Sequence, residues 1–122
     1  MKLDFSNINV LVVGDFMLDS FILGSSNRIS PEAPVPVVLT KEKNIALGGA
    51  GNVINNLYTL GCNIFLSGVV GSDSTGKMII DMLNSINIDT SGIISDSEHI
   101  STKKERIFID GKQVLRLDEE VR

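Results

Sequence analysis

The sequence has little of what stabilises or marks several common classes of protein. Its 122 residues contain one cysteine (Cys62), one histidine and no tryptophan. The fold therefore cannot depend on disulfides, and we expect a reducing compartment. No apolar run reaches the roughly 18–20 residues of a membrane span, and the N-terminal stretch, interrupted by Asp4 and Asn7, lacks the shape of a secretory signal. These absences predict a soluble protein of the cytoplasm with no membrane partner.

Positive charge is scarce as well. Eleven Lys and Arg residues against fifteen Asp and Glu give a formal net charge of -4, so nothing indicates a nucleic-acid partner. Lys103, Lys104 and Arg106 form a local basic cluster. The content of 43% hydrophobic and 21% charged residues is ordinary for a globular protein and excludes disorder. The length fits one modest domain.

Buried strands and two helices are indicated by the apolar pattern. Residues 8–14, INVLVVG, and 64–70 are continuous apolar runs, which favour strands buried on both faces of a parallel sheet. Within residues 48–61, apolar residues at helical spacing follow the first glycines, and Gly61 is expected to cap the C-terminus of this helix. A second, amphipathic helix is expected over residues 74–86. A short strand near Ile93 and Ile94 should follow. Last come two strands joined by Asp110 and Gly111, which are typical hairpin residues.

Proline shapes the segment between the first strand and the first helix. Pro31, Pro34 and Pro36 exclude a helix and a central strand, so residues 24–46 are interpreted as a lid-like edge ribbon. The order of elements predicts an α/β fold, with a mostly parallel sheet flanked by helices and a small β lid. Two helices cannot cover both faces of such a sheet. We therefore expect the sheet to expose an edge and an uncovered face.

The stretch VVGSDSTGKMII resembles a phosphate-binding P-loop by spacing but fails in its chemistry. Met78 stands where a hydroxyl should bind Mg²⁺, and Asp73 would place a carboxylate among the phosphates. The alternative is a strand-to-helix turn at Gly71, with Asp73 capping a helix that begins near Ser74. We favour the capped turn.

Two further motifs have both a structural and a functional interpretation. GGAGNV begins like a dinucleotide-binding fingerprint, but the third glycine position of that fingerprint is occupied by Ile54. The motif also does not follow the first strand, where such a fingerprint belongs. Gly49 and Asn52 either present amides to an anionic or polar ligand or belong to tight helix–sheet packing. In GDFMLD, Asp15 and Asp19 would lie at the carboxyl end of the first strand. There they either accept hydrogen bonds from sugar hydroxyls or are solvated loop acids.

The basic cluster is equally open to two explanations. Strand alternation places Lys104 and Arg106 on one face, where they could clamp a phosphate or simply form a solvated strand face. Lone His99 is interpreted as a surface-loop residue and Cys62 as core filling, so no metal site is expected.

Together these motifs resemble the ribokinase-like carbohydrate kinases of the pfkB family. GGAGN followed by Gly61 and Gly71 is similar to the first family signature, with Ile54 where members usually have a small residue. The turn GSDSTGK resembles the family's G-x-D-x-x-G turn. The runs RISPEAPVPVV and TKKERIFIDGKQVLRLD resemble the branch that acts on D-glycero-D-manno-heptose 7-phosphate in ADP-heptose synthesis. The resemblance extends from about Asn9 to Glu120.

The resemblance implies a site and a reaction. Its substrate-binding residues would be Asp15, Asp19, Arg28, Gly49, Asn52, Lys104 and Arg106, with the basic residues near the 7-phosphate. The complete enzyme would use ATP and Mg²⁺ to phosphorylate the anomeric hydroxyl, and its lid strands would pair two subunits into a homodimer.

The resemblance also implies a missing catalytic half. Family members carry the catalytic aspartate in a C-terminal G-A-G-D motif, together with the ATP site. The only glycines after Gly76 in this sequence are Gly92 and Gly111, and neither lies in such a motif. We therefore expect residues 1–122 to be the N-terminal, substrate-binding part of a kinase, with no catalytic residue and no activity alone. The alternatives are a fragment of another pfkB-type sugar kinase, a non-catalytic sugar-phosphate-binding module and, with least support, a nucleotide-binding module.

Overall fold

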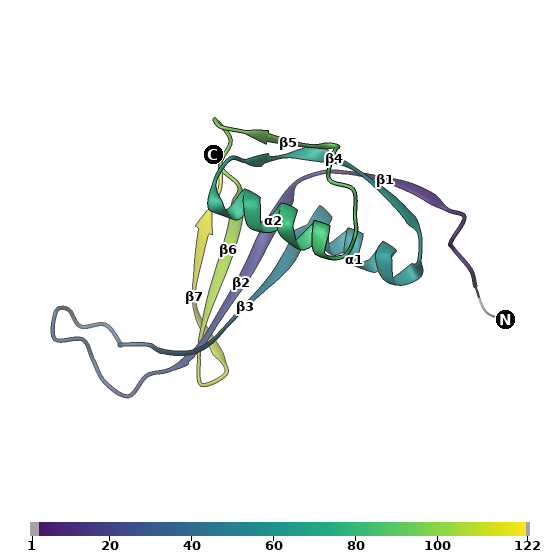
Figure 1. The fold of residues 1–122 in the computed structure, drawn as a ribbon. Coiled ribbons are helices and arrows are strands. Elements are labelled where there is room, and N and C mark those ends of the chain that lie inside the picture. The colour runs from purple at the N-terminus through teal and green to yellow at the C-terminus, as the bar shows by residue number, and fades with distance from the viewer. Residues whose placement is uncertain (1–2, 122) are drawn as a thin grey trace.

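The computed structural model, which describes residues 3–121, is built from two sheets and two helices (Figure 1). We call the three-stranded sheet the body sheet, and its strand order is β1-β4-β5. We call the four-stranded sheet the lid sheet, and its strand order is β3-β2-β6-β7. The body sheet comprises β1 (Asn9–Val13), β4 (Asn63–Gly71) and β5 (Ile93–Asp96). The lid sheet comprises β2 (Phe16–Ser25), β3 (Leu39–Gly49), β6 (Thr102–Ile109) and β7 (Lys112–Glu119). The helices are α1 (Ala50–Leu60) and α2 (Ser74–Ser85).

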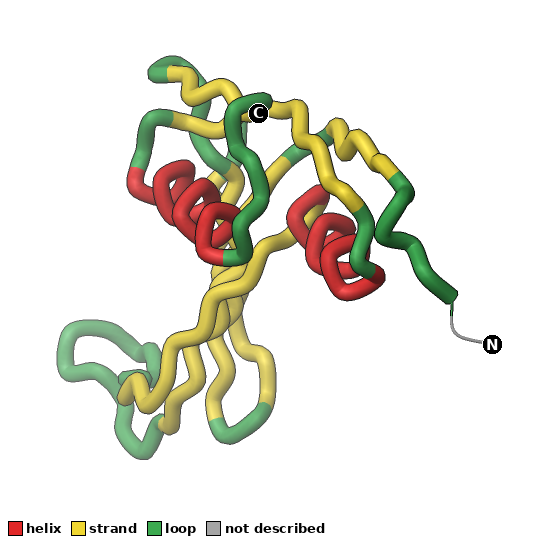
Figure 2. The backbone as a smooth tube through the Cα atoms, turned by 45° about the vertical axis from the view of Figure 1, so that its right-hand side comes forward, coloured by secondary structure: helices red, strands yellow, loops and turns green. Residues whose placement is uncertain are grey.

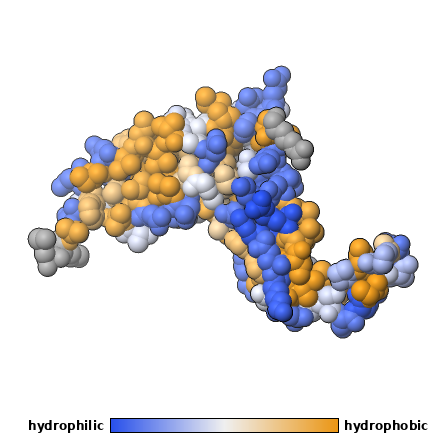
Figure 3. Space-filling view, turned by 180° about the vertical axis from the view of Figure 1, so that it is seen from behind, coloured by the Kyte–Doolittle hydropathy of each residue, from blue (hydrophilic) through white to orange (hydrophobic). Residues whose placement is uncertain are grey.

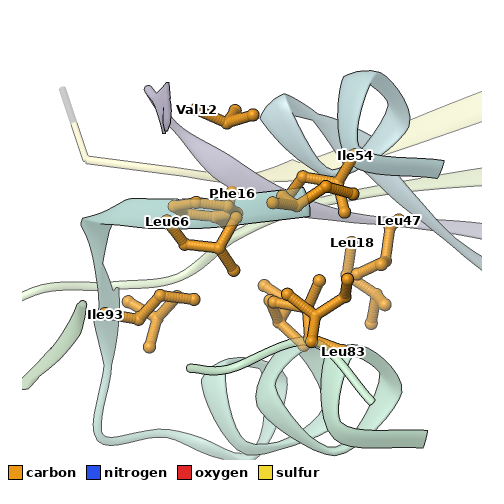
Figure 4. Close-up of a cluster of buried hydrophobic side chains, with 12 residues drawn as sticks. Val12, Phe16, Leu18, Leu47, Ile54, Leu66, Leu83 and Ile93 are labelled. Carbon is orange, nitrogen blue, oxygen red and sulfur yellow. The ribbon is translucent and has the colours of Figure 1, made fainter. Parts of the chain in front are cut away.

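The body sheet is parallel, as the apolar runs predicted, and one of its faces packs against both helices. Val12 and Leu66, paired in neighbouring strands, meet Ile54 of α1 and Leu83 of α2 in the core (Figure 4). Phe16, at the start of β2, extends this core toward the lid sheet. The core thus lies between the helices, the body sheet and the first residues of the lid sheet.

The opposite face of the body sheet is open to solvent. Leu11 and Val13 are 62% and 69% exposed, and Phe65, Val69 and Ile94 are exposed beside them. Apolar side chains gather on the rear of the body in Figure 3. The expectation that residues 8–14 and 64–70 are buried on both faces is therefore wrong for the described residues, because α1 and α2 both lie on the same side. The uncovered face that the element count predicted is confirmed.

The lid sheet projects from the body, and its outer end carries the loop that joins β2 to β3 (Figure 2). β2 pairs with β3 antiparallel and with β6 parallel, while β6 and β7 form an antiparallel hairpin. The prolines of the predicted ribbon lie in the β2–β3 loop, where Ile29 and Pro36 form one isolated bridge. The lid strands extend beyond residues 24–46, since β2 begins at Phe16 and β3 ends at Gly49.

Local end signals are confirmed at both helices and at the hairpin. Gly61 adopts the left-handed conformation at the C-terminus of α1, and the Asp73 side chain caps α2 by accepting a hydrogen bond from the Gly76 amide. Asp110 and Gly111 have φ values of 48° and 83°, as the tight hairpin turn requires. The two helices have 11 and 12 residues. Within the described part of the chain, no helix has the length and apolar character needed to cross a membrane.

Candidate functional site

Three segments connect the lid sheet to the body, and the predicted site residues cluster around them. Asp15 lies between β1 and β2, Gly49 ends β3 directly before α1, and Ser101 precedes β6. The first two connections are bonded to each other, because the carbonyl oxygen of Asp15 accepts a hydrogen bond of 2.9 Å from the Ala50 amide. The end of β1 and the start of α1 are thus held side by side at the base of the lid sheet.

Gly49 has the close packing that one interpretation of its motif predicted, and it stands at the start of α1. Its φ is 57°, and a Cβ there would lie 2.5 Å from the Asp15 carbonyl oxygen, so the backbone admits only glycine. The same residue is the N-terminal cap of α1 and supplies no side chain to its amides, and no acidic residue lies in the first turn. Asn52 is exposed on that first turn. The packing therefore leaves a helix N-terminus that favours negative charge.

One face of the lid sheet carries several charged side chains, including Asp19, Lys104 and Arg106 and, on β7, Arg116 and Asp118. The Arg106 guanidinium donates to an Asp19 carboxylate oxygen at 2.9 Å, and both side chains are 23% exposed. Lys104 pairs directly opposite Asp19 in the register of β2 and β6, so it shares this face. Arg106 also lies over the ring of Phe21, 5.4 Å from its centroid. The guanidinium is therefore oriented by an ion pair and by a ring.

Two hollows meet at Asp15. A groove of about 610 Å³ runs along β1 and α1 and is lined mainly by apolar side chains, with Asp15 and Gly49 at one end. A second cavity of about 280 Å³ lies between the end of β1 and the start of β6, and its polar lining comes from Asp15, His99, Thr102, Lys104 and Glu120. The smaller cavity has the convergent polar groups that a binding site needs, whereas the larger groove is an uncovered strand edge.

The structure separates the remaining predicted residues along the lid. Asp15 lies in the short link between β1 and β2, but Asp19 lies within β2 and faces Arg106 instead of the end of β1. Arg28 is exposed in the loop at the outer end of the lid sheet, away from Asp15 (Figures 1 and 2). His99 lies in the loop between β5 and β6, as expected, where it is half-buried and lines the smaller cavity. Its local sequence carries no signal for this, because the cavity forms only when β6 joins β2.

The other face of the lid sheet holds a separate charge cluster. Glu105 accepts a hydrogen bond of 2.8 Å from the buried Ser20 hydroxyl, and its carboxylate lies 3.3 Å from Lys43 and 3.5 Å from Lys103. The Ser20 hydrogen bond, followed by the two lysines, outweighs partial burial and lowers the pKa of Glu105. Glu105 is therefore ionised at neutral pH and ties β6 to β2 and β3 away from the cavity.

The chain matches a known protein family over nearly its whole length. A family model described as pfkB family carbohydrate kinase matches residues 7–119, which is nearly the whole chain. The chain belongs to the pfkB carbohydrate kinase family. Its two sheets and two helices are part of a ribokinase-like α/β fold.

Individual relatives of this pfkB family member agree with that assignment. The bifunctional protein HldE of Helicobacter pylori strain P12 is 48% identical over 113 residues, covering 93% of this chain and 24% of that protein. The bifunctional protein HldE of Geobacter sulfurreducens is 44% identical over 115 residues, covering 94% and 24%. The chain thus spans about a quarter of the length of these relatives.

Solved structures of family members share the fold. A carbohydrate kinase from Agrobacterium tumefaciens superposes with a TM-score of 0.72 at 20% identity and covers 92% of this chain and 35% of that one. An Arabidopsis thaliana ribokinase complexed with ribose and ATP gives a TM-score of 0.69 at 17% identity, with coverage of 92% and 35%. At these identities the likeness concerns the fold alone.

Proposed function

We propose that the chain is the substrate-binding part of a kinase that phosphorylates D-glycero-D-manno-heptose 7-phosphate at its anomeric hydroxyl. The observation that carries the proposal is the cavity in which Asp15, from the end of β1, shares the polar lining with Lys104 of β6. A sugar phosphate has hydroxyls at one end and a dianion at the other, so it needs both kinds of partner. The HldE relatives and the run RISPEAPVPVV support the heptose substrate.

Each predicted residue has a chemical role in this proposal. Asp15 and Asp19 accept hydrogen bonds from sugar hydroxyls, while Gly49 and Asn52 contribute the amides at the start of α1. Lys104 and Arg106 bind the phosphate, and the ion pair with Asp19 orients the Arg106 guanidinium. Arg28 would join such a site only from the lid loop of a second copy, because its own loop extends away from Asp15.

The lid sheet is also the proposed surface of a homodimer. Ile22, Ile107 and Leu115 are paired across β2, β6 and β7 on the face opposite to Asp19. Ile45 and Leu117 are exposed on the same face. Burial of such a row against its copy would be favourable at about 25 cal/mol per Å² of apolar area.

The location that we propose is the cytoplasm, where a kinase can draw on cellular ATP.

Phosphoryl transfer needs groups that we do not assign to these residues. ATP and Mg²⁺ would be held by the G-A-G-D half of a complete family member, where the catalytic base also lies. Solved structures of a fructokinase from Xylella fastidiosa with bound ATP and of a ribokinase from Cryptococcus neoformans in complex with ADP support the nucleotide. What these 122 residues contribute is recognition of the sugar and orientation of its anomeric hydroxyl.

Isothermal titration of the purified chain with the heptose 7-phosphate tests the recognition step, and ADP release in the presence of ATP and Mg²⁺ tests the catalytic one. We expect sugar-phosphate binding without ADP release. Lys104→Gln should weaken binding at least about tenfold, since it removes a charge-assisted hydrogen bond. Lys112→Gln, an equivalent change at the hairpin turn, is the matched control.

The results separate the proposals. Absence of binding, or binding unaffected by Lys104→Gln, would remove the sugar-phosphate site. Sugar-dependent ADP release by this chain would show that a base and an ATP site lie within it. The main alternative is a non-catalytic sugar-phosphate-binding module, favoured if the coding sequence beyond Arg122 contains no G-A-G-D motif.

A further inference from the structure

A hydrogen-bonded node joins the end of β4, the start of α2 and the residue before β6. Asp73 accepts from the Gly76 amide at 2.7 Å with one carboxylate oxygen and from the Ser101 amide at 2.9 Å with the other. The Ser101 hydroxyl accepts in turn from the Gly71 amide at 2.8 Å. Ser101 is only 1% exposed. One serine thus uses both its amide and its hydroxyl to bind the helix and the body sheet.

The segments of this node are packed too closely to tolerate extra atoms. A Cβ on Gly76 would lie 2.0 Å from the Gly71 carbonyl oxygen and 2.8 Å from the Ser101 hydroxyl. A Cβ on Gly71 would lie 2.4 Å from the His99 carbonyl oxygen. The backbones therefore approach directly, and a residue that shifts Ser101 must also shift its neighbours.

The node lies at the base of the cavity wall. Thr102 is the first residue of β6, and with Lys104 and His99 it lines the 280 Å³ cavity opposite Asp15. Ser101 lies between His99 and Thr102 in the chain. The residue whose amide Asp73 accepts from therefore directly precedes β6, which lines the cavity. On the other side of the cavity, Asp15 is fixed independently through its carbonyl bond to Ala50.

We propose that Asp73 is a positioning residue for the sugar-phosphate site, because its carboxylate fixes the start of β6 and thereby the distance between Lys104 and Asp15. This inference rests on the proposed function for its ligand, but the clamp itself is a statement about the protein alone. Asp73 does not line the smaller cavity. Asp73 acts through Ser101. This contact is distinct from the capping of α2 because it uses the other carboxylate oxygen.

Asp73→Asn separates the clamp from the cap. Asparagine caps helices about as well as aspartate, so its single side-chain oxygen can retain the Gly76 amide. The other position then carries an NH₂ donor, which cannot accept from Ser101. Ser101→Ala removes the other half of the node, the acceptor for the Gly71 amide. Asp89→Asn is the control, since Asp89 accepts from the amide and hydroxyl of Ser91 at 2.9 Å and 3.0 Å in an exposed turn.

Residue-resolved amide hydrogen exchange of the 122-residue chain tests the clamp without any ligand. In Asp73→Asn we expect the amides of Thr102 and Lys104 to exchange about tenfold faster, the effect of one ordinary hydrogen bond on a local opening. The amides of α2 should keep their rates. Ser101→Ala should change the same β6 amides, and Asp89→Asn should change none of them.

Titration with D-glycero-D-manno-heptose 7-phosphate then measures positioning. At a temperature where the variant remains folded, we expect Asp73→Asn to raise the Kd about tenfold, again by the loss of one hydrogen bond. Exchange rates in Asp73→Asn that match Asp89→Asn would overturn the inference. So would faster exchange confined to α2, which describes a cap alone, or uniformly faster exchange through α2 and β6, which describes a general loss of stability. If the parent chain binds no sugar phosphate, the proposed function fails, and the exchange pattern still decides the role of Asp73.

Discussion

The ion pair between Asp19 and Arg106 should contribute measurably to the stability of the lid sheet. It is a 2.9 Å contact between β2 and β6, and both side chains are 23% exposed. Arg106→Gln removes the charge and the fixed fork of donors, while Asp19→Asn removes the acceptor charge. We expect each single change, and their combination, to lower the free energy of unfolding.

The expected magnitude follows from the partial burial of the pair. Hydrogen bonds to charged groups contribute about 1.5–3 kcal/mol, and the remaining exposure reduces this toward the range of surface pairs. We expect a coupling energy of about 1–2 kcal/mol between the two sites. Arg106→Gln alone should cost about 2 kcal/mol, because it also removes roughly 0.5–1 kcal/mol of interaction with the Phe21 ring.

A double-mutant cycle in urea at pH 7 isolates the pairwise contribution, since the loss of the ring contact cancels between the two arms. Arg116 and Asp118 supply an internal control: their contact is also 2.9 Å, but the side chains are 49% and 27% exposed and lie two residues apart on β7. That cycle should give about 0–1 kcal/mol. Equal coupling energies for the two pairs would refute the argument that burial and cross-strand placement make the Asp19 pair the stronger.

Three further predictions concern separate parts of the molecule. Gly49→Ala should lower stability by more than about 1 kcal/mol in thermal unfolding, because it forces a side chain into a positive φ against the Asp15 carbonyl; an unchanged Tm would contradict the close contact. The lowered pKa of Glu105 stabilises the fold above the ordinary value of 4.5, and this contribution is lost as pH falls below it. Glu105→Gln should accordingly be less stable at pH 7 and show a flatter decline in acid, which urea midpoints at several pH values would reveal. Phe65→Lys should reduce the fluorescence of a bound apolar dye while changing stability by less than about 0.5 kcal/mol, and undiminished dye binding would show that the open face of the body sheet is not its site.

Local signals in the sequence predicted most of the body. Gly61, Asp73 and the Asp110-Gly111 turn each act within a few residues, so the ends of α1, α2 and the hairpin could be predicted from neighbours alone. The two apolar runs gave the parallel strands β1 and β4. Their burial could not be predicted equally well, because an apolar strand looks the same in sequence whether its second face is covered or open.

The lid sheet and half of the candidate site depend on distant partners. β2 contains Asp19 and Ser20 among apolar residues, and these polar positions are satisfied only by Arg106 and Glu105 of β6. No periodicity within residues 16–25 shows that β6 will pair there. For the same reason, sequence placed Asp15 and Asp19 together, whereas the structure puts one at the end of β1 and the other within the lid. His99 was missed because its role depends on where β6 begins.

The parallel pairing of β2 with β6 also determines when this surface can form. Asp19 and Arg106 are 87 residues apart in the chain, and Ser20 and Glu105 are 85 apart. During synthesis, β2 and β3 can pair as a hairpin early, but the acid on β2 must wait until β6 has left the ribosome. Closing a segment of this length is slow, because the entropy of the intervening chain is lost before any contact compensates it. The face that would recognise a ligand therefore forms later than the β2–β3 hairpin, once β6 is available.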